Sequence, residues 1–213
     1  MTQNLQHGTQ QQYPQHPAYG QQQPHPAHTQ QYTWGNHMQQ PHAPAPRRPR
    51  SATTWQGVVL GSATVAMGLI AGVWYAFSVA VMPALARSGD RVYIEVMQNI
   101  NDVIENPLFF ASFFGALILT GVAAWQQRTT AAKWWVIGAL IAYGLVFVLT
   151  SGANVPLNNA LAAAGDPAKI KDPHAVRAAF ENSWVFWNVV RGLLSTAALV
   201  LLAKALPRRH RSL

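Results

Sequence analysis

Four long apolar segments constrain what this chain can fold into. Each approaches or exceeds the ~20 apolar residues that an α-helix needs to cross a hydrocarbon core of ~30 Å. They run over residues 57–82, 108–125, 134–153 and 184–206. Only 10% of the residues are charged, compared with ~25% in an ordinary soluble domain. The sequence therefore predicts an all-α fold, a bundle of four transmembrane helices, in an integral multi-pass protein whose first partner is the lipid bilayer.

The charges outside the spans predict an orientation. The turn at 126–133 and the N- and C-terminal flanks of the membrane domain carry Lys and Arg without acids. The connections 87–106 and 154–183 hold all 7 acidic residues. The positive-inside rule then places both termini in the cytoplasm, in what we expect to be a bacterial plasma membrane. The net charge of +8 is spread over helix ends instead of forming one patch. This distribution suits anionic lipid headgroups and gives no indication of nucleic-acid binding.

Composition divides the chain into a tail and a membrane domain. Residues 1–54 are rich in Gln, His and Pro, so they cannot bury a core and are predicted to be a disordered cytoplasmic tail. The membrane domain is residues 55–207, and residues 208–213 form a basic C-terminal tail. The histidines of the long tail are irregularly spaced and the chain has 0 cysteines, so no metal site is predicted. A solvated extension, weak metal binding and a protein-interaction segment remain alternatives for this tail.

The connection after the first span predicts a further helix. Apolar residues recur at helical spacing over 92–104, and polar residues fill the opposite face. This pattern indicates an amphipathic helix that lies on the outer surface or caps the bundle. Asn106 and Pro107 form a favourable start for the second span, because Asn caps helices and Pro needs no N–H there.

Small residues in the first span allow two interpretations. Glycines recur on one face of the predicted helix, at Gly57, Gly61, Gly68 and Gly72. In lipid, such residues let helices approach closely. They predict either close packing within the bundle or a homo-oligomer formed through this face.

A polar face within the fourth span is the main candidate for function. Trp184, Trp187, Asn188, Arg191 and Ser195 follow the i, i+3, i+4, i+7 spacing of one helix face. A charge at the bilayer centre costs roughly 2.5 kcal/mol or more. Arg191 therefore either points inward with its polar neighbours or extends along the lipid face to the headgroups.

Prolines predict where this face finds partners. Pro83 should end the first span and Pro156 should break the third, because proline lacks an N–H. Broken backbone at membrane depth is tolerated only inside protein or beside a cavity. We therefore expect an outward-facing pocket, although each proline could simply terminate a helix. Beside the tryptophans of the fourth span, its expected lining residues are Phe77, Asn154, Pro156 and Asn158.

Three short motifs resemble the anthrone oxygenase-like family of four-helix membrane proteins. "MPAL", "NVPLNNAL" and "WVFWNVVR" occur in that order among the spans. The pattern P-x-N-x-x-L is present at residues 156–161, and W-x-x-x-[N/H]-x-x-R at 184–191. The resemblance covers about residues 57–206 and excludes the tail. Many bacterial members of the family have no assigned function.

The resemblance implies an activity on a flat apolar substrate. Fungal relatives are associated with oxidation of anthrones to anthraquinones by molecular oxygen, without an evident cofactor, and no cofactor is predicted here. An anthrone loses a proton to give an electron-rich anion. Arg191 could stabilise that anion, and Trp184 and Trp187 could stack on its rings.

The proton acceptor is less well defined by the resemblance. Fungal members tend to have His at the position of Asn188 and Thr at that of Gly192. Since Asn is not a base at neutral pH, Glu181 or Glu105 must replace it if either lies within hydrogen-bond reach. We accordingly take Arg191, Asn188 and Glu181 as the candidate catalytic residues.

Two other classes of function compete with an enzyme. The missing base favours a non-catalytic membrane protein that binds a lipid or quinone, or that scaffolds a partner. A proton-coupled exporter is disfavoured, because such carriers need an acid within a span and all 7 acids lie in connections.

Overall fold

The computed structural model describes residues 50–209, and the four spans are confirmed as helices. Residues 1–49 and 210–213, which include most of the predicted N-terminal tail, lie outside the described residues. Within the described part no strand forms. The helices long and apolar enough to cross a membrane are Trp55–Leu85, Pro107–Gln126, Lys133–Ala163 and Pro173–Arg208. The elements are α1 (Arg50–Ala76), η1 (Phe77–Val81), α2 (Met82–Leu85), α3 (Asp90–Ile104), α4 (Pro107–Gln126), α5 (Lys133–Leu149), η2 (Thr150–Asn154), α6 (Val155–Ala163), η3 (Pro167–Lys169), α7 (Pro173–Ala205) and η4 (Leu206–Arg208).

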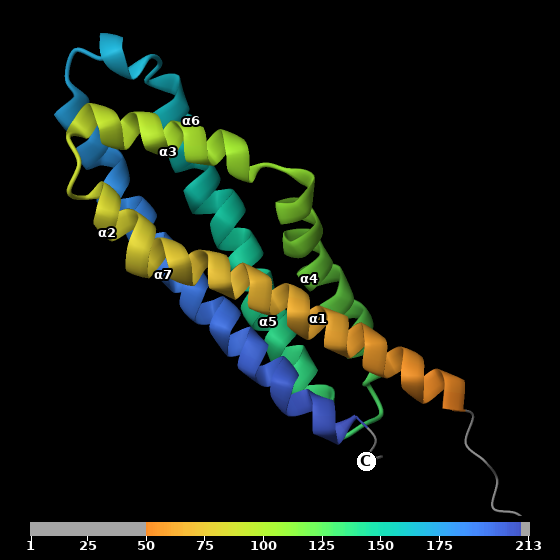
Figure 1. Ribbon diagram of the computed structural model, residues 1–213. Coiled ribbons are helices and arrows are strands. Elements are labelled where there is room, and N and C mark those ends of the chain that lie inside the picture. Colours follow the sequence, from red (N-terminus) through yellow and green to blue (C-terminus); the bar gives the residue numbers. More distant parts are fainter. Residues whose placement is uncertain (1–49, 210–213) are drawn as a thin grey trace, which may run out of the picture. The chain divides into compact units, whose positions relative to one another are not determined.

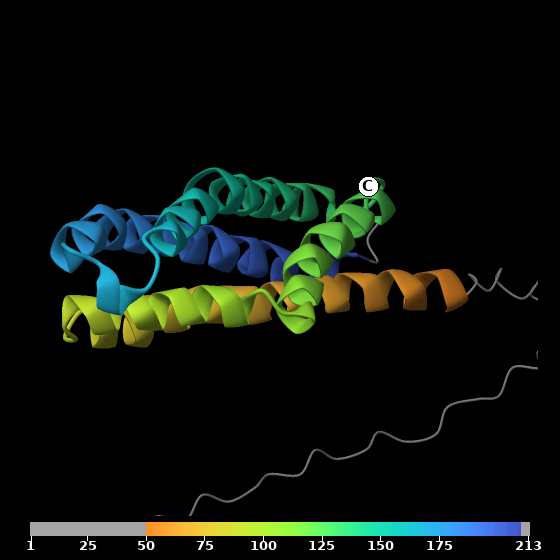
Figure 2. The same ribbon diagram turned by 90° about the horizontal axis from the view of Figure 1, so that it is seen from above.

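Helix α7 lies between α1 and α5, and α4 packs on α1 and α5 from the other side (Figures 1 and 2). The core between them consists of buried aliphatic and aromatic side chains spaced by alanines, including Leu60, Met67, Val136 and Tyr143. Alanine at 116, 139 and 198 lets the helix backbones approach closely. The Tyr143 hydroxyl donates to the carbonyl of Phe113 at 2.9 Å, which joins α5 to α4 without leaving a buried polar group unpaired.

The predicted amphipathic helix is α3, and it packs across α6 and α7 (Figure 1). Its apolar face buries Tyr93, Ile94 and Met97 in a second cluster with Leu161 and Phe180. The expected start of the next helix is also present. The Asn106 side chain accepts hydrogen bonds from the first backbone N–H groups of α4, at 3.0 Å each.

The prediction that prolines break the first and third spans is wrong. Both helices continue through a five-residue π-helical turn, η1 before Pro83 and η2 before Pro156. In each turn the N–H that closes it reaches back five residues, from Met82 to Phe77 and from Val155 to Thr150. The wider turn accommodates the missing proline N–H without ending the helix, and such turns are frequent at functional sites.

The glycines of the first span divide between the two interpretations. A Cβ at Gly68 would contact Leu199 of α7 at 3.8 Å, so this glycine packs within the bundle. A Cβ at Gly61 or Gly72 would meet nothing within 4 Å in the described residues. Association of two chains through that part of the face stays a prediction.

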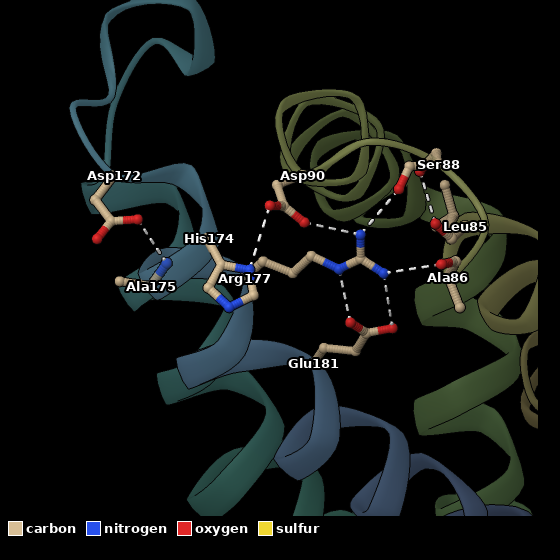
Figure 3. Close-up of polar contacts among 9 residues, drawn as sticks. All are labelled: Leu85, Ala86, Ser88, Asp90, Asp172, His174, Ala175, Arg177 and Glu181. Atoms are coloured by element: carbon tan, nitrogen blue, oxygen red, sulfur yellow. Dashed lines mark hydrogen bonds and ion pairs between the residues drawn. The ribbon is translucent and has the colours of Figure 1, made fainter.

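Arg177 fastens the start of α7 to the turn before α3 (Figure 3). Its guanidinium donates to Glu181 at 2.7 Å, to Asp90 at 3.0 Å and to the carbonyls of Ser88 and Ala86. It also lies over the ring of Tyr93, 4.5 Å from its centre. Burial raises the pKa of the Tyr93 hydroxyl, and the charge of Glu181 adds to this, so the ring beneath the guanidinium stays neutral.

Removing this guanidinium should destabilise the fold. Arg177→Ala leaves two carboxylates and two carbonyls without their donor, and we expect a loss of about 2–3 kcal/mol of unfolding free energy, measured by denaturant titration in detergent micelles. The matched control is Arg91→Ala, an exposed arginine that donates to the carbonyls of Pro167 and Ile170. Its cost should stay below about 1 kcal/mol. Equal costs for the two variants would contradict this role of Arg177.

Candidate functional site

The polar face of α7 points into the bundle, which confirms the inward-facing interpretation. Arg191 is only 3% exposed, and Trp184, Asn188 and Ser195 are buried with it. The side chain of Trp187 is partly exposed and meets the ring of Phe186 edge-on, with ring centres 5.0 Å apart. The buried stripe therefore consists of every member of the predicted face except Trp187.

Two tryptophans and one asparagine hold Arg191. Its Cζ lies 4.0 Å from the centre of the Trp74 ring and 5.6 Å from that of Trp184. Its Nη2 donates to Oδ1 of Asn188 at 3.3 Å. A cation over an aromatic face is stabilised most where water is excluded, so the two rings offset part of the cost of burying the charge.

Asn188 connects α7 to the π-helical turn of the first span. Its Nδ2 donates to the carbonyl of Trp74 at 3.1 Å and to Oγ of Ser78 at 2.9 Å. Ser78 in turn donates to the same Trp74 carbonyl at 2.9 Å. The amide thus satisfies a backbone group loosened by η1 and orients Arg191 at the same time.

The third span supplies the opposite wall. Its π-helical turn η2 begins at Thr150, whose hydroxyl bonds the carbonyl of Val146 at 2.8 Å, and ends at Asn154, which is 1% exposed. One turn further, Oδ1 of Asn158 accepts from Nε1 of Trp184 at 2.8 Å. Polar groups of α7 and of the third span therefore meet at one level.

A cavity of about 180 Å³ lies between these walls. Most of its lining is aromatic or aliphatic, and its polar residues come from α7, from the third span and from the end of α3. The residues that line it are Trp74, Phe77, Ile100, Asn101, Ile104, Glu105, Phe109, Phe110, Phe113, Phe114, Phe147, Thr150, Ser151, Asn154, Val155, Asn158, Trp184 and Arg191.

Three of the lining residues have polar atoms without a hydrogen-bond partner in the described chain. These atoms are Nε1 of Trp74, Nε of Arg191 and both side-chain heteroatoms of Asn154. All three residues are at most 3% exposed. Buried polar groups are nearly always paired, and leaving one unpaired costs about 1–3 kcal/mol. Residues that line the cavity thus carry unpaired donors that could pair with an oxygen-bearing ligand.

The predicted site residues divide into two groups. Arg191, Trp184, Asn154, Asn158 and Phe77 line the cavity. The others are absent from its lining: Asn188 lies behind Arg191, Glu181 pairs with Arg177, and Pro156 and Trp187 lie elsewhere on their helices.

Sequence reasoning missed one side of the cavity. Trp74 lies in the middle of an uncharged span, away from the interface where membrane tryptophans gather, and this position was an available signal. The "FFASFF" run of α4 contributes four lining phenylalanines. Glu105, which the sequence offered only as an alternative to Glu181, is the carboxylate in the lining.

Within residues 50–209 no group of three His, Asp or Glu side chains could hold a metal ion. The fold and the cavity define a four-span membrane protein with a buried polar and aromatic site. The model of the anthrone oxygenase family matches residues 107–201, from the start of α4 into the last turns of α7. Over these residues the resemblance to an anthrone oxygenase-like family is confirmed. Searches of the curated proteins and of the solved structures give no match.

The amide of Asn188 should be required for the geometry around Arg191. Asn188→Ala removes three buried hydrogen bonds, and we expect a loss of roughly 2–3 kcal/mol of unfolding free energy in detergent. Asn182→Ala, an exposed asparagine on the same helix, should change stability by less than about 0.5 kcal/mol. If Asn188→Ala were as stable as this control, the amide would not be the link between α1 and α7.

Proposed function

We propose that this protein is a membrane enzyme that oxidises a lipophilic aromatic compound of the anthrone type with molecular oxygen and without a cofactor. The observation that carries the proposal is the unpaired set of buried donors on Trp74, Asn154 and Arg191 at the inner side of an aromatic cavity. Donors fixed where negative charge develops lower the barrier to forming an anion, because they need no reorganisation during the reaction. The family match of residues 107–201 supports the same chemistry.

The reaction balances with oxygen as the only co-reactant. A base removes a proton from the methylene carbon of the anthrone, and the electron-rich anion reacts with O₂ at that carbon to give a peroxide. Loss of water from the peroxide forms the second carbonyl of the quinone. Arg191 stabilises the oxyanion of the first step, while Trp184 and Phe77, whose ring centres lie 5.6 Å apart, pack against the rings of the substrate.

Glu105 is the best candidate for the base. It is the carboxylate among the residues that line the cavity, and no hydrogen bond or ion pair engages it in the described chain. Glu181, by contrast, is held by Arg177 at 2.7 Å. The proposal therefore assigns proton transfer to Glu105 and gives Asn188 the role of orienting Arg191.

The cavity volume fits an aromatic ligand of small size. A closed apolar cavity of ~150 Å³ holds a benzene molecule, and this one measures about 180 Å³. An anthrone carries its oxygen on the central of three fused rings, so binding with that oxygen beside Arg191 requires the phenylalanines of α4 that line the cavity to move and enlarge it.

The side of the membrane on which the site lies follows from the distribution of Lys and Arg between the flanks and the connections. With basic flanks in the cytoplasm, the cavity and α3 lie toward the outer leaflet. The chain has 0 cysteines, so a single cysteine introduced on α3 reports this directly. Labelling of intact cells by an impermeant maleimide supports the orientation, and labelling only after lysis contradicts it.

Oxygen consumption with anthrone tests the activity. The purified full chain, reconstituted in lipid vesicles, should accelerate the formation of anthraquinone above the uncatalysed rate. Arg191→Gln should lower kcat/KM by about 10²-fold or more, because it removes the charge that stabilises the anion. No acceleration by the unaltered chain would rule out the enzyme.

Glu105→Gln should lower kcat by roughly 10²-fold, since proton transfer by a placed base contributes about that much. Glu95→Gln is the matched control: Glu95 lies on α3, the helix that ends just before Glu105, and is exposed like Glu105, but it does not line the cavity. An unchanged kcat in Glu105→Gln would show that Glu105 is not the base and that solvent or the substrate itself accepts the proton.

Non-catalytic binding of a quinone or lipid is the second candidate. It is favoured by the exposure of Glu105, the carboxylate in the lining, whereas the buried residues Arg191, Trp74 and Asn154 could bind a quinone carbonyl without further chemistry. Tight, Arg191-dependent binding of anthraquinone without any consumption of oxygen would select this alternative.

A further inference from the structure

A second hollow lies on the lipid side of the cavity. It occupies about 330 Å³ between the first two spans, with Leu69, Ile70 and Val73 on α1 and Leu108, Phe109 and Ser112 on α4. We call it the lateral cleft. Leu69 is 58% exposed and Leu108 77% exposed, on helices that are both apolar enough to cross a membrane. The cleft therefore opens toward hydrocarbon.

The polar groups of the lateral cleft are satisfied within the protein. The Ser112 hydroxyl donates to the carbonyl of Leu108 at 3.1 Å, and the Asn106 amide caps α4. This contrasts with the inner cavity, whose buried donors lack partners. The cleft thus offers an apolar passage without a binding group that would retain a polar molecule.

One aromatic side chain separates the cleft from the cavity. Phe109 lines both spaces, as does Ile104 at the end of α3. The Phe109 ring meets the Trp74 ring edge-on, with centres 6.1 Å apart, and stacks on Phe113 at 5.6 Å. Behind Trp74 lies the guanidinium of Arg191, 4.0 Å from the ring centre.

We propose that the lateral cleft is the entry route by which the ligand of the cavity arrives from the bilayer, and that Phe109 is the side chain it must displace. The route depends on the proposed binding site at Arg191. It restricts the ligand to flat, uncharged aromatics that dissolve in hydrocarbon, and it excludes conjugates with a sugar or a phosphate. The wall that the cleft and the cavity share, formed by Phe109 and Ile104, carries the proposal.

Binding kinetics test the route. The full chain in phosphatidylcholine vesicles is mixed with 1-hydroxyanthraquinone, and quenching of tryptophan fluorescence gives the association rate, the dissociation rate and Kd. Leu69→Trp fills the cleft from α1, and Phe109→Ala removes the separating ring. The matched control for the first variant is Val65→Trp, one turn away on α1, 65% exposed and outside the cleft lining.

A side chain that narrows the entry route raises the free-energy barrier between the free and the bound state, but it leaves the free energies of those two states unchanged. We expect Leu69→Trp to slow association and dissociation each by tenfold or more, with Kd within about twofold of the unaltered chain, and Val65→Trp to change neither rate. Phe109→Ala should accelerate both rates. The same variants can be assayed by the oxidation of anthrone, and kcat/KM should then fall in Leu69→Trp.

The outcomes separate this route from the site it serves. Binding that depends on Arg191 but keeps its rates in Leu69→Trp would overturn the route alone and favour entry beside α3. A raised Kd with an unchanged association rate would also overturn it, because it would make Leu69 part of the binding site. Absence of any Arg191-dependent binding would overturn the site and the route together.

Discussion

The charge of Arg191 within the bundle is the constraint on which the rest of the structure depends. A guanidinium at this depth costs roughly 2.5 kcal/mol or more unless protein groups replace its hydration. Trp74 and Trp184 supply ring faces, and Asn188 supplies one acceptor. These contacts fix the rotation of α7 against the first span. They leave Nε of the guanidinium unpaired, beside the cavity.

The two π-helical turns are the structural device that creates this cavity. Each widens a helix just before a proline, at Phe77–Val81 and at Thr150–Asn154. Phe77 and Asn154, which lie in these turns, both line the cavity. At these turns Ser78 and Thr150 donate to carbonyls of their own helices, and Asn188 of α7 donates to the carbonyl of Trp74. The same local distortion therefore serves both the proline and the site.

The end of the bundle that α3 covers is stabilised by a different means. There Arg177 pairs with Glu181 and Asp90, and α3 covers the ends of the helices that enclose the cavity. Ion pairs are used outside the apolar spans, and aromatic stacking with amides is used inside them. This division follows the free-energy cost of removing a charge from water, which is larger within the apolar spans than at the end of the bundle. It also explains why Glu181, although it follows the helical spacing of the polar face, is not part of the cavity.

Much of the architecture could be predicted from the sequence. Span length, apolar composition and the amphipathic pattern of α3 are local properties, and the spacing of Trp184, Asn188 and Arg191 already places them on one face. The continuation of the helices past Pro83 and Pro156 was not predictable in this way, because proline normally breaks a helix and only the folded chain shows the π-helical turn that accommodates each proline. The same holds for Trp74 and Glu105, which lie far from Arg191 along the chain.

The sequence by itself thus determined four membrane-crossing helices and a polar stripe that had to find partners, since hydrocarbon offers none. Only the tertiary structure decided which side chains those partners are. Trp74 covers the guanidinium, Asn188 bonds the first span, and Glu181 is bound to Arg177 near the start of α7. The physical reason is that burial and pairing depend on how whole helices rotate and cross, and no local pattern specifies that.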